Sequence, residues 1–103
     1  MQIALYHKHY NEQYLEAVKS EMQTLGTPVI RCIWSEVYEM WMAVEGCHRL
    51  RAAKALGVTP VIQDITTDAT ATIQRDEEDT VVDVTQLAAE LTDDVWKAEI
   101  IEF

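Results

Sequence analysis

The sequence has few basic residues, few glycines and few cysteines. Its 103 residues include 8 lysines and arginines against 18 acidic residues, which gives a formal net charge of −10 at pH 7. Because sequence-independent binding to DNA depends on cations that displace phosphate counterions, this charge argues against DNA as a partner. The 2 cysteines show no Cys-x-x-Cys spacing, so we expect reduced thiols rather than a zinc site or a disulfide framework.

Long apolar runs are also missing. No stretch approaches the roughly 20 apolar residues that a membrane-spanning helix needs, and the first ten residues lack the charged-then-apolar pattern of a signal peptide. The sequence therefore predicts a cytoplasmic protein that has no contact with a membrane. A chain of 103 residues is typical of one domain, so we expect residues 1–103 to fold as a single unit.

Charge is unevenly distributed along the chain. Residues 46–63 contain no acid, and three cations lie close together within them: Arg49, Arg51 and Lys54. From residue 64 onward, twelve acidic residues face only two basic ones. We interpret residues 66–103 as an acidic, mainly helical part whose surface is solvated or contacts a protein partner.

Hydrophobic periodicity predicts an α/β (α+β) fold, a small mixed sheet with helices packed on it. We expect a helix over Asn11–Leu25, with Asn11 as its N-cap and Gly26 at its end, because apolar residues recur there every three or four positions. A second helix is expected over residues 47–56, ending at Gly57. Short apolar runs predict strands at these ranges: 3–5, 29–34, 40–44 and 61–65, the middle two forming a hairpin.

The last third of the chain is less regular. Residues 66–79 are rich in Thr and Asp, which predicts mainly loop with one short helical turn. Leu87 and Leu91 predict one or two closing helices, for which Thr85 and Thr92 are candidate N-caps.

The most informative segment is Val44–Ala53, where a strand turns through Gly46 directly into a helix. The first N–H groups of a helix have no acceptor within it, and the helix dipole adds partial positive charge there, so such a corner attracts phosphate. Gly46 lets a ligand approach the backbone closely. His48 and Arg49 add donors, and an arginine can contact one phosphate with two N–H groups.

This segment resembles the Gly-x-His-Arg-x-x-Ala-Ala signature of the ParB/sulfiredoxin superfamily. Sulfiredoxins carry Gly-Gly-Cys-His-Arg, and residues 46–49 match the last four positions, with Glu45 in place of the first glycine. Chromosome-partition proteins of the ParB branch carry Gly-Glu-Arg-Arg, an aromatic residue, arginine and alanine. Four residues of this chain fall on that pattern: Gly46, Arg49, Arg51 and Ala52. The predicted order of elements over residues 1–65, the motif core, is similar to that of sulfiredoxins.

The resemblance implies a ParB/sulfiredoxin-like domain that binds a nucleoside triphosphate, ATP or CTP, together with Mg²⁺. It places the phosphate and nucleotide contacts on five residues of the turn: Gly46, Cys47, His48, Arg49 and Arg51. Partition proteins continue into a helix-turn-helix, which this sequence does not show, so DNA is not expected as a partner.

Three functions are open at this stage. The chain binds a nucleotide phosphate and supports phosphoryl transfer or hydrolysis, or it is a thiol enzyme like sulfiredoxin that uses Cys47, or it is a regulatory module that binds protein. Cys47 is a candidate nucleophile because a helix N-terminus and basic neighbours lower the pKa of a thiol. Glu45 is a candidate catalytic carboxylate that holds a metal ion or accepts a proton. His7 and His9 lack a third ligand, so no metal site is expected from side chains alone.

Overall fold

Helices and strands alternate through most of the chain. The structure is a computed structural model that describes residues 1–6, 10–75, 77–95 and 99–103, so His7 and His9 lie outside the described residues. The elements are β1 (Gln2–Ala4), α1 (Glu12–Leu25), β2 (Val29–Ser35), β3 (Met40–Ala43), α2 (Cys47–Leu56), β4 (Val61–Asp64), β5 (Thr70–Arg75), β6 (Glu78–Asp83), α3 (Val84–Asp94) and β7 (Ile100–Glu102). None of the helices in these ranges has the length and apolar composition that crossing a bilayer requires.

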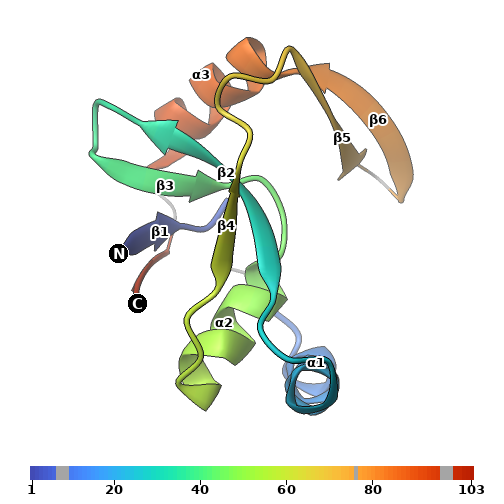
Figure 1. The fold of residues 1–103 in the computed structure, drawn as a ribbon. Coiled ribbons are helices and arrows are strands. Elements are labelled where there is room, and N and C mark those ends of the chain that lie inside the picture. Colours follow the sequence, from blue (N-terminus) through green and yellow to red (C-terminus); the bar gives the residue numbers. More distant parts are fainter. Residues whose placement is uncertain (7–9, 76, 96–98) are drawn as a thin grey trace.

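The main sheet is mixed and has the strand order β4-β2-β3-β1-β7. β1 runs parallel to β3, and β2 runs parallel to β4, whereas β2 and β3 form the predicted antiparallel hairpin. β5 and β6 form a separate two-stranded sheet (Figure 1). The prediction of a small mixed sheet with helices packed on it is therefore confirmed.

The two faces of the main sheet are covered by different elements. Along β2, Ile30 and Cys32 face the core shared with α2, whereas Ile33 faces the core shared with α3 and the β5–β6 hairpin. This follows from the alternation of side chains along a strand. Figure 1 shows α1 and α2 on one side of the sheet and α3 with the hairpin on the other.

The helix α1 begins and ends at the predicted residues. The Asn11 side chain accepts a hydrogen bond of 2.9 Å from the Tyr14 N–H, as an N-cap residue does. At the other end Gly26 has a φ of +88° and its N–H bonds to the Met22 carbonyl. α1 packs on α2 through small and flexible side chains: Val18, Met22, Ala52 and Ala53.

The prediction of a loop over residues 66–79 was wrong, because this segment contains β5 and the start of β6. Ala71 and Ile73 are buried while Thr70 and Thr72 between and beside them are exposed, which is the period-two pattern of a half-buried strand. Threonine is itself common in strands, and the loop prediction gave too much weight to its polarity. Residues 66–103 are therefore not mainly helical.

The N-cap of α3 also differs from the prediction. The Asp83 carboxylate accepts a hydrogen bond of 3.0 Å from the Gln86 N–H, so Asp83 is the cap. Thr85 and Thr92 lie inside the helix, and the Thr92 hydroxyl donates to the Ala88 carbonyl at 2.7 Å. An N-cap must precede the first helical residue, and the strand β6 ends directly at that place.

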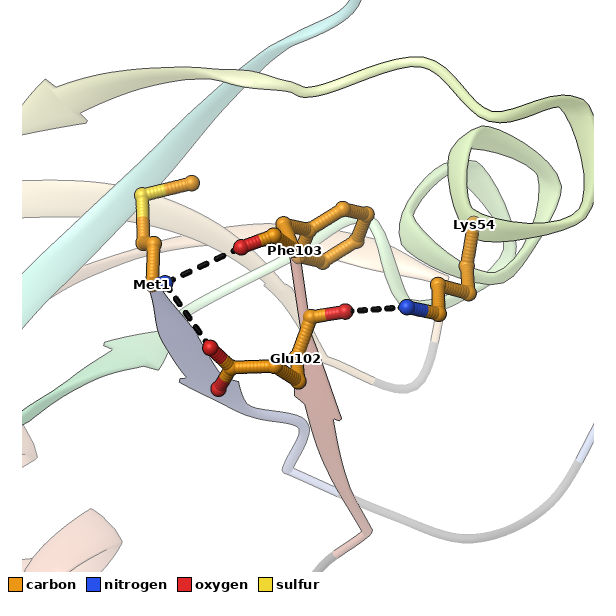
Figure 2. A network of polar contacts seen from close by, with 4 residues as sticks. All are labelled: Met1, Lys54, Glu102 and Phe103. Atoms are coloured by element: carbon orange, nitrogen blue, oxygen red, sulfur yellow. Dashed lines mark hydrogen bonds and ion pairs between the residues drawn. The ribbon is translucent and has the colours of Figure 1, made fainter.

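The first and last strands are neighbours, although they lie at opposite ends of the chain. β7 pairs antiparallel with β1, and the Met1 ammonium donates to the Glu102 carboxylate at 3.1 Å and to the Phe103 carbonyl at 3.0 Å (Figure 2). Lys54 on α2 donates to the Glu102 carbonyl. Lys54 is one of the three cations in residues 46–63, and its hydrogen bond connects β7 to α2.

We expect Asp83→Ala to destabilise the fold by about 1 kcal/mol, because the Gln86 N–H loses its acceptor. In a domain of this size that corresponds to a fall in melting temperature of about 4–8 °C. Asp83→Asn keeps a side-chain oxygen in place and should melt close to the wild type. Equal losses in both variants, measured by circular dichroism, would show that the charge of Asp83 matters and its cap does not.

Candidate functional site

The sheet topology brings the beginnings of two helices together. β1 and β3 are parallel neighbours, so the segments that leave them start at the same edge of the sheet, and α1 and α2 follow these segments. The Asn11 N–H, at the start of α1, donates to His48 Nε2, at the start of α2, at 3.1 Å. The rings of Tyr14 and His48 meet edge to face with centroids 4.6 Å apart.

The turn into α2 requires glycine. Gly46 has a φ of +77°, in the left-handed region that side chains disfavour. A Cβ at this position would lie 2.8 Å from Ile30 Cδ1 and 3.1 Å from the Arg49 guanidinium. Gly46 is the N-cap residue of α2 and has no side chain, so among the described residues α2 lacks the kind of side-chain cap that Asn11 gives α1.

A pocket of about 640 Å³ lies at this turn. One wall is made by the ends of β1 and β3, by the first turn of α2 and by α1 from Tyr14 to Glu21, and the facing wall comes from β5 and α3. Its floor is apolar and belongs to the protein core, as the buried side chains of Leu5, Met42, Val44 and Leu87 show. Its polar lining comes from both walls: Tyr6, Tyr14, Glu21, Glu45, Cys47, His48, Arg49, Gln74, Glu90 and Asp94.

Glu45 forms an ion pair with Arg49, one of the three cations that lie close together in residues 46–63. One of its oxygens accepts a hydrogen bond from Arg31 Nη2 at 2.7 Å, and the other lies 3.4 Å from Arg49 Nη2. The hydrogen bond from Arg31 is the main reason why the pKa of Glu45 is lowered, and the charges of Arg31 and Arg49 act in the same direction. A carboxylate with a lowered pKa is a weak proton acceptor, which disfavours the catalytic role predicted for Glu45 as a base.

His48 and Arg49 both line the pocket. Arg49 donates to the Val29 carbonyl at 3.1 Å, and 40% of its side chain is exposed. His48 accepts through Nε2, so this nitrogen does not donate in the conformation described. The donation to phosphate that the sequence predicted for His48 would therefore have to come from Nδ1.

Arg51 is a buried residue of α2 and is not among the described residues that line the pocket. Its side chain is 7% exposed and its guanidinium bonds to Glu99 Oε2 at 2.8 and 3.2 Å. The guanidinium also lies 5.0 Å from the ring centroid of Tyr10, a cation–π distance. The phosphate contact predicted for Arg51 thus has no support in this arrangement, because the side chain connects α2 to the segment before β7.

The two cysteines occupy different environments. Cys47 is 3% exposed but lines the pocket, where it shares a hydrogen bond with Tyr6. Burial is the largest cause that raises the pKa of Tyr6, and Cys47 raises it further. Cys32 is fully buried in β2, and burial raises its pKa to about 12.

Several pocket residues were not predicted from the sequence: Tyr6, Tyr14, Gln74, Glu90 and Asp94. Glu90 and Asp94 are four positions apart on α3, a spacing that places both on one helix face. That spacing is visible in the sequence, but the position of α3 opposite the Gly46 turn depends on tertiary packing. Within the described ranges, His, Cys, Asp and Glu side chains form no group of three or more that could hold a metal ion.

The chain was compared with models of known protein families, with curated proteins and with solved structures, and none of these comparisons gave a match.

We expect Gly46→Ala to destabilise the fold more than Gly57→Ala does. Both glycines have positive φ, +77° and +70°, so both variants bear the cost of about 1–2 kcal/mol for a left-handed L-residue. A Cβ at Gly57 meets no described atom within 4 Å, whereas at Gly46 it meets Ile30 and Arg49. Urea unfolding measures the difference, and equal losses would mean that the chain relaxes around residue 46 without cost.

Proposed function

We propose that the pocket at the Gly46 turn binds a nucleoside phosphate, with the phosphate at the start of α2. The observation that carries this proposal is that the start of α2, a left-handed glycine turn with the Arg49 guanidinium against it, lines a pocket of about 640 Å³. Small-molecule pockets commonly have volumes of about 300–1,000 Å³, so a nucleotide is an appropriate occupant.

We place the phosphate end of the ligand at the wall that contains the start of α2 and Arg49. Backbone N–H groups at a helix N-terminus and the positive end of the helix dipole favour an anion. Arg49 adds a planar donor that suits phosphate oxygens. Gly46 has no side chain, which lets the Arg49 guanidinium lie against the turn.

The other half of the pocket explains why we propose a nucleotide rather than phosphate alone. The apolar floor, formed by core residues such as Met42 and Leu87, suits the faces of a base. Tyr14 adds an aromatic ring on the α1 side, and Glu90 and Asp94 bring acceptor oxygens on the α3 side. A ligand with an anionic end and an end that donates hydrogen bonds from amino or hydroxyl groups matches this division.

The resemblance to the ParB/sulfiredoxin signature supports the same ligand class, with ATP and CTP as the two candidates. Mg²⁺ is expected to arrive with the phosphates, because it keeps most of its waters and needs only one or two protein oxygens. We propose binding and assign no reaction to the pocket.

A second candidate is thiol chemistry like that of sulfiredoxins, because Cys47 lines the same pocket. In that function the nucleotide transfers a phosphoryl group to a sulfinic acid, and the thiol then attacks the sulfur of this ester, which releases phosphate and forms a thiosulfinate. A regulatory module that contacts protein through the acidic residues 66–103 is the outcome that remains if no nucleotide binds.

We expect ATP or CTP to raise the melting temperature of the protein in the presence of Mg²⁺. A ligand at 100 times its dissociation constant stabilises the fold by about 2.7 kcal/mol, which corresponds to about 10 °C or more in a domain of this size. A panel of the four common nucleoside triphosphates at millimolar concentration, with and without Mg²⁺, tests this. No shift with any of them would contradict the proposed function.

Arg49→Ala should lose most of this ligand-dependent shift while the ligand-free protein melts nearly as before, since the Arg49 side chain is 40% exposed and its contacts with Glu45 and the Val29 carbonyl contribute little. The matched control is Lys19→Ala, which removes the same charge from α1 at an ion pair with Glu16 outside the pocket. If both variants keep the full shift, Arg49 does not contact the ligand. If Arg49→Ala fails to fold, the residue serves the structure.

We expect a thiol reagent to label Cys47 faster than Cys32. Cys47 begins α2 and lines the pocket, through which a reagent reaches it, whereas Cys32 is fully buried and burial raises its pKa to about 12. Cys32→Ser and Cys47→Ser proteins separate the two rates at pH 7.5, and bound ATP should slow the labelling of Cys47. Faster labelling of Cys32 would contradict the environments described for the two thiols.

Repair of a sulfinylated peroxiredoxin distinguishes the two functions. Repair by the wild type and none by Cys47→Ser would establish the sulfiredoxin-like reaction. Nucleotide binding that persists in Cys47→Ser, without repair by either protein, would leave the binding function and make Cys47 a residue of the turn.

A further inference from the structure

Glu45 forms ion pairs with two arginines, Arg31 and Arg49, beside the proposed phosphate site. Its carboxylate is 2.7 Å from Arg31 Nη2 and 3.4 Å from Arg49 Nη2. The Glu45 side chain is 34% exposed, Arg31 is 23% exposed and Arg49 is 40% exposed. The contact of Glu45 with Arg49 is thus longer than its contact with Arg31, and Arg49 is the more exposed of the two arginines.

The guanidinium of Arg49 also lies against Gly46. A Cβ built on Gly46 would be 3.1 Å from Arg49 Nη2 and 3.4 Å from Arg49 Nε, so the side chain folds back over the turn. The donors of Arg49 are therefore already beside the start of α2. Arg49 Nη2 reaches an anion there by leaving Glu45, while Arg49 Nη1 donates to the Val29 carbonyl at 3.1 Å.

We propose that Glu45 is an internal competitor for Arg49, which a phosphate ligand must displace in order to bind. This inference rests on the proposed function, because it concerns the affinity of that site. Carboxylate and phosphate oxygens bind the same fork of guanidinium N–H groups, so the two anions compete for Arg49. Glu45 therefore lowers the affinity for phosphate rather than contacting the ligand or its metal ion.

Arg31 makes the displacement feasible. When Arg49 turns to the ligand, Glu45 keeps its shorter hydrogen bond to Arg31 and is not left as an unpaired charge. Together Arg31, Glu45 and Arg49 carry one net positive charge. The hydrogen bond from Arg31 also lowers the pKa of Glu45, so the competing carboxylate stays ionised at neutral pH.

The test compares Glu45→Gln with Glu16→Gln by isothermal titration with ATP and with CTP. Both variants remove one negative charge, but Glu16 pairs with Lys19 on α1, away from the pocket. Partly exposed ion pairs are worth about 0.2–1 kcal/mol, so Glu45→Gln should bind about 1.4- to 5-fold more tightly than Glu16→Gln. Glutamine still accepts a hydrogen bond from Arg31, so the variant should fold.

The result has clear alternatives. Equal affinities in the two variants overturn the competition, and weaker binding by Glu45→Gln overturns it in favour of a contact between Glu45 and the ligand or its Mg²⁺. If neither the wild type nor any variant binds ATP or CTP, the proposed function fails and this inference fails with it. The gain from Glu45→Gln should also shrink as salt rises from 50 to about 500 mM, because the competition is electrostatic.

A second variant tests the role of Arg31. In Arg31→Met, Glu45 loses its ion pair with Arg31 and keeps the one with Arg49. Glu45 then competes more strongly for Arg49, so binding of ATP or CTP should weaken. The control is Lys19→Met, which removes the same charge at an ion pair with Glu16. The double variant Arg31→Met with Glu45→Gln should recover that loss. Failure of the double variant to recover, with both proteins folded by circular dichroism, overturns the inference.

Discussion

The parallel pairing of β1 with β3 is the constraint on which the site depends. Since both strands run in the same direction, the segments that follow them leave the sheet at one edge, and α1 and α2 both begin there. The hydrogen bond from the Asn11 N–H to His48 joins the two helix starts. Gly46 then makes a turn that no other residue fits without strain, and Arg49 lies directly over it. The pocket is formed where these features meet.

The pocket combines a charged entrance with a floor that belongs to the core. Met42, Val44 and Leu87 are buried residues that hold the sheet against α3, and the same side chains line the cavity. Filling the cavity therefore adds contacts to the core itself, and the stability of this half of the protein is linked to whatever occupies it. Although the chain as a whole is acidic, Arg31 and Arg49 outnumber Glu45 at the turn, so these three side chains together carry one net positive charge.

The elements over residues 1–65 could be predicted from the sequence because they follow local rules. Asn11, Gly26 and Gly57 mark helix ends by their own backbone and side-chain preferences, and the apolar runs of β2 and β3 mark strands. The turn at Gly46 was visible for the same reason. The β5–β6 hairpin was missed because its alternation is carried by Ala and Thr, whose polarity suggested a loop. The facing wall on α3 could not be predicted, since it depends on where that helix packs. Arg51 and Lys54 stand close to Arg49 in the sequence, but the helix turns them toward Glu99 and Glu102.

The pairing of β1 with β7 sets the order in which the sheet is completed. A ribosome releases residues 2–4 long before residues 100–102 exist, and during that interval one edge of β1 has backbone groups with no strand beside them. The Leu5 N–H also lacks its native acceptor during that interval, because in the folded protein it donates to the Glu99 carbonyl at 2.8 Å. Contacts so distant along the chain close large loops and form slowly. The growing chain thus has an open sheet edge at β1 until β7 is synthesised, and an open edge can pair with a strand of another chain.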